Sequence, residues 1–525
     1  MSDDLREALR THFGHSDFRP GQEPAVRAAL AGRDVLAGMP TGAGKSLCYQ
    51  LPALLRDDLT IVVSPLVSLM ADQVAALSDR AVLINSQQDL AGNREALARV
   101  RGGDLRLLYV APERFAARGF IDAFEGVRVG MFVVDEAHCV SQWGHDFRPD
   151  YFELPQAVRA LGARQVFACT ATATPRVADD VIARLGLRDP LRITTGFDRP
   201  NLSYLVVRAA NDADRQKRIA AVLADPAARP AIVYAGTRAR TEELAAFLQA
   251  RLGTPVATYH AGLERSDRAE QQRRFMAGEV DVVVATNAFG MGIDKADVRT
   301  VCHASVPGSL EAYYQEAGRA GRDGKAARCL LFAANRDKGL HVHFIQQSGS
   351  GVARNARWAQ YRAIWAFVES ADCRRIAILR HFGDQSTPTV VPGIACCDAC
   401  APDALPTAPH EPVGAPPRQR DQARRPLSPR ATSRPAQVEL EELDQAILEI
   451  VLSARPSVGR TRAVEILRGG RSKLIAQNGY DSLDLYGAYA HLSAADALAQ
   501  VDALIARGVL RSTGGRFPKL ALAPR

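Results

Sequence analysis

The stretch Pro40-Thr41-Gly42-Ala43-Gly44-Lys45-Ser46 decides the fold of this chain. It joins an apolar, strand-like segment at 34–39 (DVLAGM) to a helix-like segment at 47–55 (LCYQLPALL). A glycine-rich turn at the start of a helix directs backbone N–H groups toward phosphate oxygens. Lys45 adds a positive charge for the β- and γ-phosphates, and Ser46 adds a hydroxyl for Mg²⁺. We therefore predict a nucleotide site at Thr41, Gly42, Ala43, Gly44, Lys45 and Ser46, although Met39 stands where the motif usually begins with glycine.

Two carboxylates follow another apolar segment, in the string Val133-Val134-Asp135-Glu136-Ala137-His138. Mg²⁺ bound to phosphate prefers oxygen ligands, and the strand end fixes Asp135 where it can help to hold that ion. Glu136 can then orient or activate the attacking water. An acidic pair at a strand end is common by itself. Downstream of a phosphate-binding loop, it predicts hydrolysis of the bound nucleotide.

The apolar segments indicate an α/β protein with more than one domain. A chain of 525 residues is long enough for three or four folding units. Strand-like runs alternate with helix-like segments in two series, which predicts two parallel sheets flanked by helices. A helical region, a segment rich in Pro and Arg, and helices that close with a short hairpin come after them. The predicted units are 1–207, 208–336, 337–400, 401–437 (a flexible linker) and 438–525 (a winged helix).

The nine cysteines fall into two groups. Five of them are scattered through apolar segments and are expected to be buried thiols. The other four, Cys373, Cys396, Cys397 and Cys400, are clustered late in the chain. In a cytosolic protein such a cluster favours a metal site over disulfides. Free thiols on a loop are the alternative.

Charge and hydropathy narrow the classes of partner. The chain has 66 Lys and Arg against 58 Asp and Glu, a net charge of +8. Lys and Arg displace counterions from phosphate, so the excess fits a nucleic acid, although over so long a chain it supports one only weakly. No apolar run is long enough to span a bilayer, and the opening MSDDLREALR lacks the layout of a signal peptide. We expect a cytoplasmic protein with no membrane partner.

With the phosphate-binding loop and the Asp-Glu-Ala-His string in place, the chain resembles the RecQ family of helicases. The resemblance implies two tandem RecA-like parallel-sheet domains, a helical zinc-binding subdomain and an RQC-like winged helix. It also implies ATP, Mg²⁺ and Zn²⁺ as cofactors. The string Phe18-Arg19-Pro20-Gly21-Gln22 is similar to the adenine-recognition motif of the family. There Gln22 is expected to hydrogen-bond the base, and Arg19 is expected to lie near the nucleotide.

The segment 139–149 (CVSQWGHDFRP) is similar to an aromatic-rich loop that is distinctive of RecQ proteins. Trp143 and Phe147 offer ring faces for single-strand bases, and Arg148 offers charge. Because the segment follows Asp135 and Glu136 directly, the loop could report DNA binding to the nucleotide site. The alternative is that its two aromatic side chains simply anchor a loop in the core. Ser64-Pro65-Leu66 matches a family segment that touches the nucleic-acid backbone.

The string from Tyr314 to Gly324 (YQEAGRAGRDG) matches the last helicase motif of the family. Two arginines three residues apart can reach the γ-phosphate across a cleft and stabilise charge in the transition state. By the resemblance, Arg322 is the arginine finger and Arg319 supports it. A solvated basic turn is the alternative. The position of the string, where a second helicase domain should end, favours the finger.

The resemblance extends to the end of the chain. Cys373 and the pair Cys397 and Cys400 match the family's zinc subdomain, and four thiolates would give a closed tetrahedral site. Cys396 and His381 are both candidates for the fourth ligand, because Cys396 directly precedes another cysteine. In the winged helix, Arg468 is expected to meet DNA phosphates, and the Gly514-Gly515 turn is expected to form a short wing. No HRDC-like domain is expected after the wing.

The resemblance implies an ATP-dependent DNA helicase that moves 3′→5′ on single-stranded DNA and unwinds tailed or forked duplexes. Its setting would be DNA repair, recombination or replication. We expect a monomer, and the sequence identifies no protein partner. An RNA helicase of the DEAD-box kind and a nucleic-acid-binding scaffold with an inactive motor are the alternatives. The aromatic-rich loop and the zinc cysteines argue against the first, and the intact motor residues argue against the second.

Overall fold

The computed structural model divides the chain into two compact units, residues 1–412 and 413–525, which are described separately. The structure describes residues 2–406 and 435–522, apart from 41, 86, 87, 89, 118, 145, 291–294, 335, 347–350, 471, 484, 490, 491, 493 and 514–517. Among these residues, no helix has both the length and the apolar character needed to cross a bilayer.

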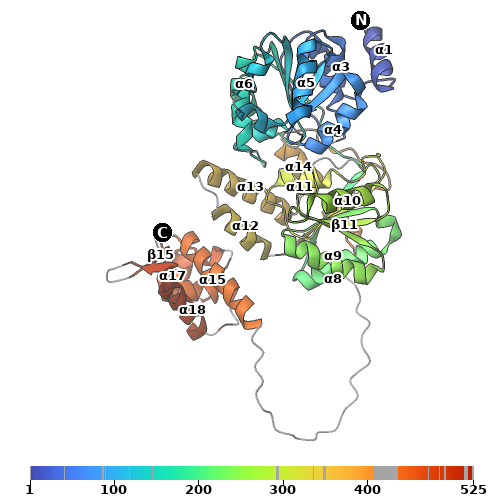
Figure 1. Ribbon diagram of the computed structural model, residues 1–525. Helices are drawn as coiled ribbons and strands as arrows, with labels where there is room; N and C mark the ends of the chain where they lie inside the picture. Colours follow the sequence, from blue (N-terminus) through green and yellow to red (C-terminus); the bar gives the residue numbers. More distant parts are fainter. Residues whose placement is uncertain are drawn as a thin grey trace. The chain divides into compact units, whose positions relative to one another are not determined.

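The first sheet has seven parallel strands in the order β3-β4-β2-β5-β6-β1-β7. The strands are β1 (Val35–Gly38), β2 (Leu59–Val63), β3 (Ala81–Ile84), β4 (Leu107–Val110), β5 (Val129–Val134), β6 (Gln165–Thr170) and β7 (Leu191–Thr194). Apolar clusters pack against helices on both of its faces, which explains why the central strands are buried throughout. The helices are α1 (Ser2–Phe13), α2 (Gln22–Leu30), α3 (Leu47–Leu55), α4 (Val67–Ala76), α5 (Leu90–Gly102), α6 (Leu154–Ala160) and α7 (Pro175–Leu185) (Figure 1).

The strand order brings the predicted nucleotide residues together. The neighbours β5, β6 and β1 end at Val134, Thr170 and Gly38. The carboxyl ends of parallel strands meet at one edge of a sheet, which is where ligands bind in open α/β folds. The phosphate-binding loop and the acidic pair therefore emerge at the same edge.

The second sheet has six parallel strands in the order β10-β11-β9-β12-β13-β8. The strands are β8 (Leu202–Arg208), β9 (Ala231–Tyr234), β10 (Val256–Tyr259), β11 (Val282–Ala285), β12 (Thr300–His303) and β13 (Ala327–Ala333). Its helices are α8 (Asp212–Ala224), α9 (Arg238–Leu252), α10 (Arg265–Met276) and α11 (Leu310–Ala317). Because β8 pairs along its whole length with β13, the second sheet begins at Leu202, before the boundary expected at residue 208.

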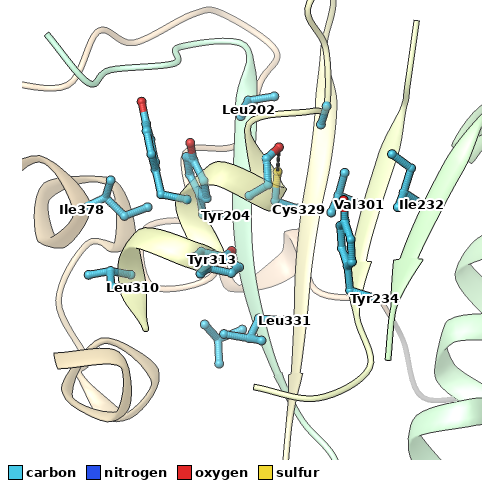
Figure 2. Close-up of a cluster of buried hydrophobic side chains, with 14 of the residues drawn as sticks. Leu202, Tyr204, Ile232, Tyr234, Val301, Leu310, Tyr313, Cys329, Leu331 and Ile378 are labelled. Atoms are coloured by element: carbon cyan, nitrogen blue, oxygen red, sulfur yellow. Dashed lines mark hydrogen bonds between the residues drawn. The ribbon is translucent and has the colours of Figure 1, made fainter. Parts of the chain in front are cut away.

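Figure 2 shows the core between this sheet and α11, where Tyr204, Tyr313 and Cys329 are buried together. The Cys329 thiol donates a hydrogen bond to the carbonyl of Ala317 at 3.5 Å. This ties the end of α11 to the sheet, so the arginine string that follows α11 starts from a fixed point.

The region after the second sheet is helical, as predicted, with α12 (Arg336–Gln346), α13 (Gly351–Glu369) and α14 (Arg374–His381). Beyond them, Cys397 pairs with Tyr204 in a parallel bridge, so the cysteine segment covers the open edge of β8. A short 3₁₀ helix, Pro402–Ala404, follows, and Leu405 packs against the core of the second sheet. Residues 401–406 therefore belong to the folded unit and not to the linker predicted to start at 401. Most of that linker, 407–434, lies outside the described residues.

The second unit packs helices around its own apolar core, with a small antiparallel strand pair at the end. Its elements are α15 (Pro435–Ser453), α16 (Arg460–Leu467), α17 (Lys473–Gln477), α18 (Ala494–Ala506), β14 (Leu510–Ser512) and β15 (Leu520–Leu522). This is the predicted arrangement of a winged helix. The expected wing turn at 514–515 lies outside the described residues.

Candidate nucleotide site, cysteine cluster and aromatic-rich loop

The phosphate-binding loop runs from β1 into α3. Gly42 and Gly44 have φ values of +87° and +79°, a left-handed conformation that side chains rarely adopt. The carboxamide nitrogen of Gln22 donates to the carbonyls of Ala43 (3.0 Å) and Gly44 (3.1 Å). The Arg19 guanidinium donates to the carbonyl of Gly42 at 2.6 Å. Both predicted adenine-side residues therefore brace the loop itself. Thr41 lies outside the described residues.

Lys45 is half-buried beside the two carboxylates. Burial alone would lower the pKa of its ammonium group, but the charges of Glu136 and Asp135 outweigh it and raise the pKa above the usual value. The side chain therefore stays charged over the whole physiological range. A fixed positive charge at this position suits the phosphates of a nucleotide.

Asp135 is held by three donors. Its Oδ1 accepts from the backbone N–H of Glu136 (2.9 Å) and from the thiol of Cys169 (3.3 Å), while Oδ2 accepts from the hydroxyl of Ser64 (3.4 Å). Burial and the neighbouring Glu136 raise the pKa of its carboxyl group. Two close carboxylates in a buried place are a donor set that a divalent cation would stabilise. Ser46 and Asp135 are the residues that would hold Mg²⁺.

Sequence reasoning missed the side chain that holds Ser46. Gln73, on α4, donates from Nε2 to the Ser46 hydroxyl oxygen at 2.9 Å. Its own Oε1 accepts from the Tyr49 hydroxyl at 3.3 Å. A serine oxygen can accept one hydrogen bond and still offer a lone pair to a metal. The two successive hydrogen bonds therefore fix the direction of the predicted Mg²⁺ ligand. A glutamine in a helical segment carries no sequence signal for that role.

The two arginines in the segment after α11 line the same cavity as the phosphate-binding loop. The cavity has a volume of about 570 Å³, within the range of ligand sites. Its walls include Lys45, Asp135 and Glu136 from the first sheet, and Arg319 and Arg322 from the segment after α11. Arg322 lies close enough to Lys45 for its charge to oppose that of the ammonium group. The structure thus brings together both walls of the predicted site.

The aromatic-rich loop is tied to the acidic pair. Tyr151 lies just beyond the loop, and its hydroxyl donates to the carbonyl of Asp135 at 3.1 Å. Trp143 packs partly against the core, and the guanidinium of Arg176 lies 3.3 Å from its ring centroid. Phe147 is half-buried, with its ring centroid 5.0 Å from that of Phe152. Trp143 and Phe147 are therefore both half-buried, each against a protein side chain.

The charged residues expected to contact DNA have protein partners in the structure. Arg148 is paired with Asp146 at 3.1 Å. In the second unit, Arg468 is exposed at the end of α16, and its Nε donates to the carbonyl of Leu492 at 2.8 Å. Neither arrangement decides whether DNA is bound, so both roles stay predictions.

The four late cysteines form one cluster. The Sγ atoms of Cys373, Cys396, Cys397 and Cys400 all lie within 4.8 Å of one another. The separations of Cys373 from Cys396 (3.6 Å) and from Cys397 (3.9 Å) match the ~3.8 Å edge of a tetrahedron built on Zn–S bonds of ~2.3 Å. His381 instead pairs with Glu311 at 2.9 Å. Cys396, and not His381, therefore lies in the cluster, and four thiolates at these separations fit a structural zinc ion.

Family models match nearly the whole chain. A DEAD/DEAH box helicase model matches residues 19–181, and a helicase conserved C-terminal domain model matches residues 215–324. A RecQ zinc-binding model matches residues 335–401, and an RQC domain model matches residues 434–525. The ATP-dependent DNA helicase RecQ of Bacillus subtilis is 35% identical over 522 residues, which span 98% of this chain and 82% of the relative. The chain belongs to the RecQ family.

Other relatives and solved structures agree with this assignment. The ATP-dependent DNA helicase RecQ of Pasteurella multocida is 39% identical over 398 residues, which cover 75% of this chain and 62% of the relative. The helicase MrfA bound to DNA superposes with a TM-score of 0.52 at 19% identity, over 63% of this chain and 50% of the other. Mss116p bound to single-stranded RNA superposes with a TM-score of 0.54 at 16% identity, over 73% of this chain and 89% of the other. These structures bear on the fold alone, and they confirm the two tandem RecA-like domains of this RecQ chain.

Proposed function

We propose that this RecQ-family chain is an ATP-dependent DNA helicase that moves 3′→5′ on single-stranded DNA and separates duplex strands. The observation that supports it most is the single cavity that gathers Lys45, Asp135 and Glu136 with Arg319 and Arg322. A nucleotide in that cavity would be contacted from both sheets at once. Nucleotide binding would then close the gap between them and hydrolysis would open it, which is the movement that a translocating motor requires.

Each residue of the cavity has a role in this proposal. Lys45 binds the phosphates, and Ser46 with Asp135 would hold Mg²⁺, which supplies charge neutralisation at the transferred phosphoryl group. Glu136 orients the attacking water and accepts its proton. Arg322 stabilises the charge of the transition state, and Arg319 supports it.

DNA contact is assigned to the aromatic-rich loop and to the winged helix. Phe147 and Trp143 would stack on unpaired bases, while Arg148 and Arg468 would meet phosphates. The four-cysteine cluster would hold Zn²⁺ as a structural ion. The 3′→5′ direction, the preference for tailed or forked duplexes and a role in repair, recombination or replication rest on family membership. A monomeric, cytoplasmic protein completes the proposal.

Strand separation tests the proposal directly. Duplexes with a 3′ tail, a 5′ tail or no tail are incubated with the protein, ATP and Mg²⁺, and a matched RNA duplex is included. We expect unwinding of the 3′-tailed DNA and none with Lys45→Ala. A preference for the 5′ tail would overturn the direction, and a preference for RNA would overturn the substrate. A protein whose ATP hydrolysis is not stimulated by DNA would not be a motor of this kind.

A further inference from the structure

A second cavity, of about 290 Å³, lies against the nucleotide cavity and shares Gly290, Gln315 and Arg319 with it. Its volume is at the small end for a ligand site, enough for one flat group and not for a longer segment of a chain. The walls come from the aromatic-rich loop, the second sheet and the helical subdomain. Its lining includes Asp146, Phe344, Arg357, Gln360 and Tyr361.

One wall is aromatic and held rigidly. The Tyr361 ring lies 5.4 Å from Trp358 and 6.3 Å from Trp365, centroid to centroid. His341 supports it from a third side at 6.0 Å. Both ring nitrogens of His341 are engaged, one with the carbonyl of Val306 (2.7 Å) and one with Trp365 Nε1 (3.3 Å), and burial lowers its pKa. The wall therefore consists of rings that support one another edge to face or at a tilt, with no charge on His341.

Phe344 stands beside this wall with 45% of its surface exposed. A large aromatic side chain in water forfeits the free energy that burial would provide. A flat ligand that stacks in the cavity would cover it. The arrangement is typical of proteins that bind single strands, which use aromatic faces because every base has one.

The charges around the cavity tolerate a phosphate. Arg357 is exposed at the cavity, and its guanidinium Nη1 donates to the carbonyl of Phe344 at 3.4 Å. The carboxylate of Asp146 is paired with Arg148 at 3.1 Å, and that of Glu316 is paired with His303 at 2.9 Å. The negative groups at the cavity are thus partly compensated by their neighbours.

We propose that this cavity binds one unpaired nucleobase of single-stranded DNA, stacked on Tyr361 and Phe344 with its phosphate near Arg357. The inference rests on the proposed DNA helicase function and adds a base-binding subsite to it. Gln360 donates from Nε2 to the carbonyls of Trp143 (3.4 Å) and Gly144 (3.2 Å). A base in the cavity therefore lies beside the loop that follows the catalytic carboxylates.

Abasic sites test the subsite. A duplex with a fluorescent 3′ tail fixes the register, and each of a series of tails carries one abasic nucleotide at a different position. Binding is measured by anisotropy without ATP. Loss of a stacked base is worth about 5- to 150-fold in affinity. We expect one tail position to show such a loss with the wild-type protein. Tyr361→Ala and Phe344→Ala should weaken binding of the intact tail and remove the effect of that abasic site, whereas Tyr361→Phe should preserve both.

Two comparisons keep the outcome clear. Arg357→Ala should weaken binding more than Arg362→Ala, because both arginines are exposed on α13 but only Arg357 lines the cavity. Zinc content and thermal melting verify that each variant is folded. If Tyr361→Ala does not fold, Phe344→Ala carries the test, because Phe344 is exposed. If the abasic effect is the same in Phe344→Ala as in the wild type, the subsite is refuted. The helicase function then still stands, provided that the protein unwinds DNA and that DNA stimulates its ATP hydrolysis. If the wild type shows no DNA-stimulated hydrolysis, the proposed function itself fails.

Discussion

The hydrogen bond from Gln73 to Ser46 makes a quantitative prediction about Mg²⁺. Gln73→Leu keeps the volume of the side chain but removes the donor that lies 2.9 Å from the Ser46 oxygen. A hydrogen bond of this kind contributes about 0.5–1.5 kcal/mol, which corresponds to a change of about 2- to 12-fold in an equilibrium constant. Because the bond orients a metal ligand, the concentration of Mg²⁺ needed for half-maximal ATP hydrolysis should rise by that factor. The maximal rate at saturating Mg²⁺ should change much less.

The assay is DNA-stimulated ATP hydrolysis measured across a Mg²⁺ series. Asp72→Ala, on the same helix and exposed, serves as the control and should leave the series unchanged. In a Ser46→Ala background, Gln73→Leu should add little, because the residue through which it acts is already gone. An unchanged Mg²⁺ requirement in Gln73→Leu, or a full additive effect in the double variant, would refute the reasoning.

Three further predictions test other parts of the structure. Arg322→Ala should lower kcat for ATP hydrolysis by about 10³-fold or more. Steady-state kinetics with single-stranded DNA measure this, and a retained kcat would contradict the role of Arg322 as the arginine finger. Cys396→Ser should lose bound zinc while His381→Ala retains it, as elemental analysis after dialysis will show; the opposite pattern would restore His381 as the ligand. Gly44→Ala places a Cβ 2.6 Å from the Gln22 carboxamide at a φ of +79°, and the left-handed conformation alone costs roughly 1–2 kcal/mol. Affinity for a non-hydrolysable ATP analogue should therefore fall about 5- to 30-fold, and unchanged affinity would show that the loop relaxes without loss.

Local patterns predicted the parts of the site that are local in the chain. The phosphate-binding loop and the acidic pair each follow a buried strand directly, so their positions follow from the strand they terminate. The arginine string could be placed in the cavity only through the family resemblance, because nothing in the segment after α11 specifies which cleft it faces. The structure places Arg319 and Arg322 there.

Features that depend on distant pairing were not predictable. The segment 202–208 is apolar enough for either sheet, and only its pairing with β13 assigns it to the second. Adjacent cysteines looked awkward as joint ligands because neighbouring side chains point apart in an extended segment. The chain turns immediately after Cys397, where the N–H of Ala401 bonds to its carbonyl at 2.9 Å. That turn returns Cys400 to the cluster, in which the Sγ atoms of Cys396 and Cys397 both lie.

Two contacts connect the predicted DNA-binding segments to the catalytic residues, and each acts on a different predicted Mg²⁺ ligand. Gln73 on α4, the helix that follows Ser64-Pro65-Leu66, bonds to Ser46. Tyr151, just past the aromatic-rich loop, bonds to the backbone of Asp135. A shift of either segment on DNA would disturb the position of one ligand through its hydrogen bond, and metal-assisted catalysis depends steeply on the position of the metal ligands. If both routes operate, weakening one should leave part of the DNA stimulation at subsaturating Mg²⁺, whereas weakening both should leave, under the same conditions, a basal ATPase that DNA no longer accelerates.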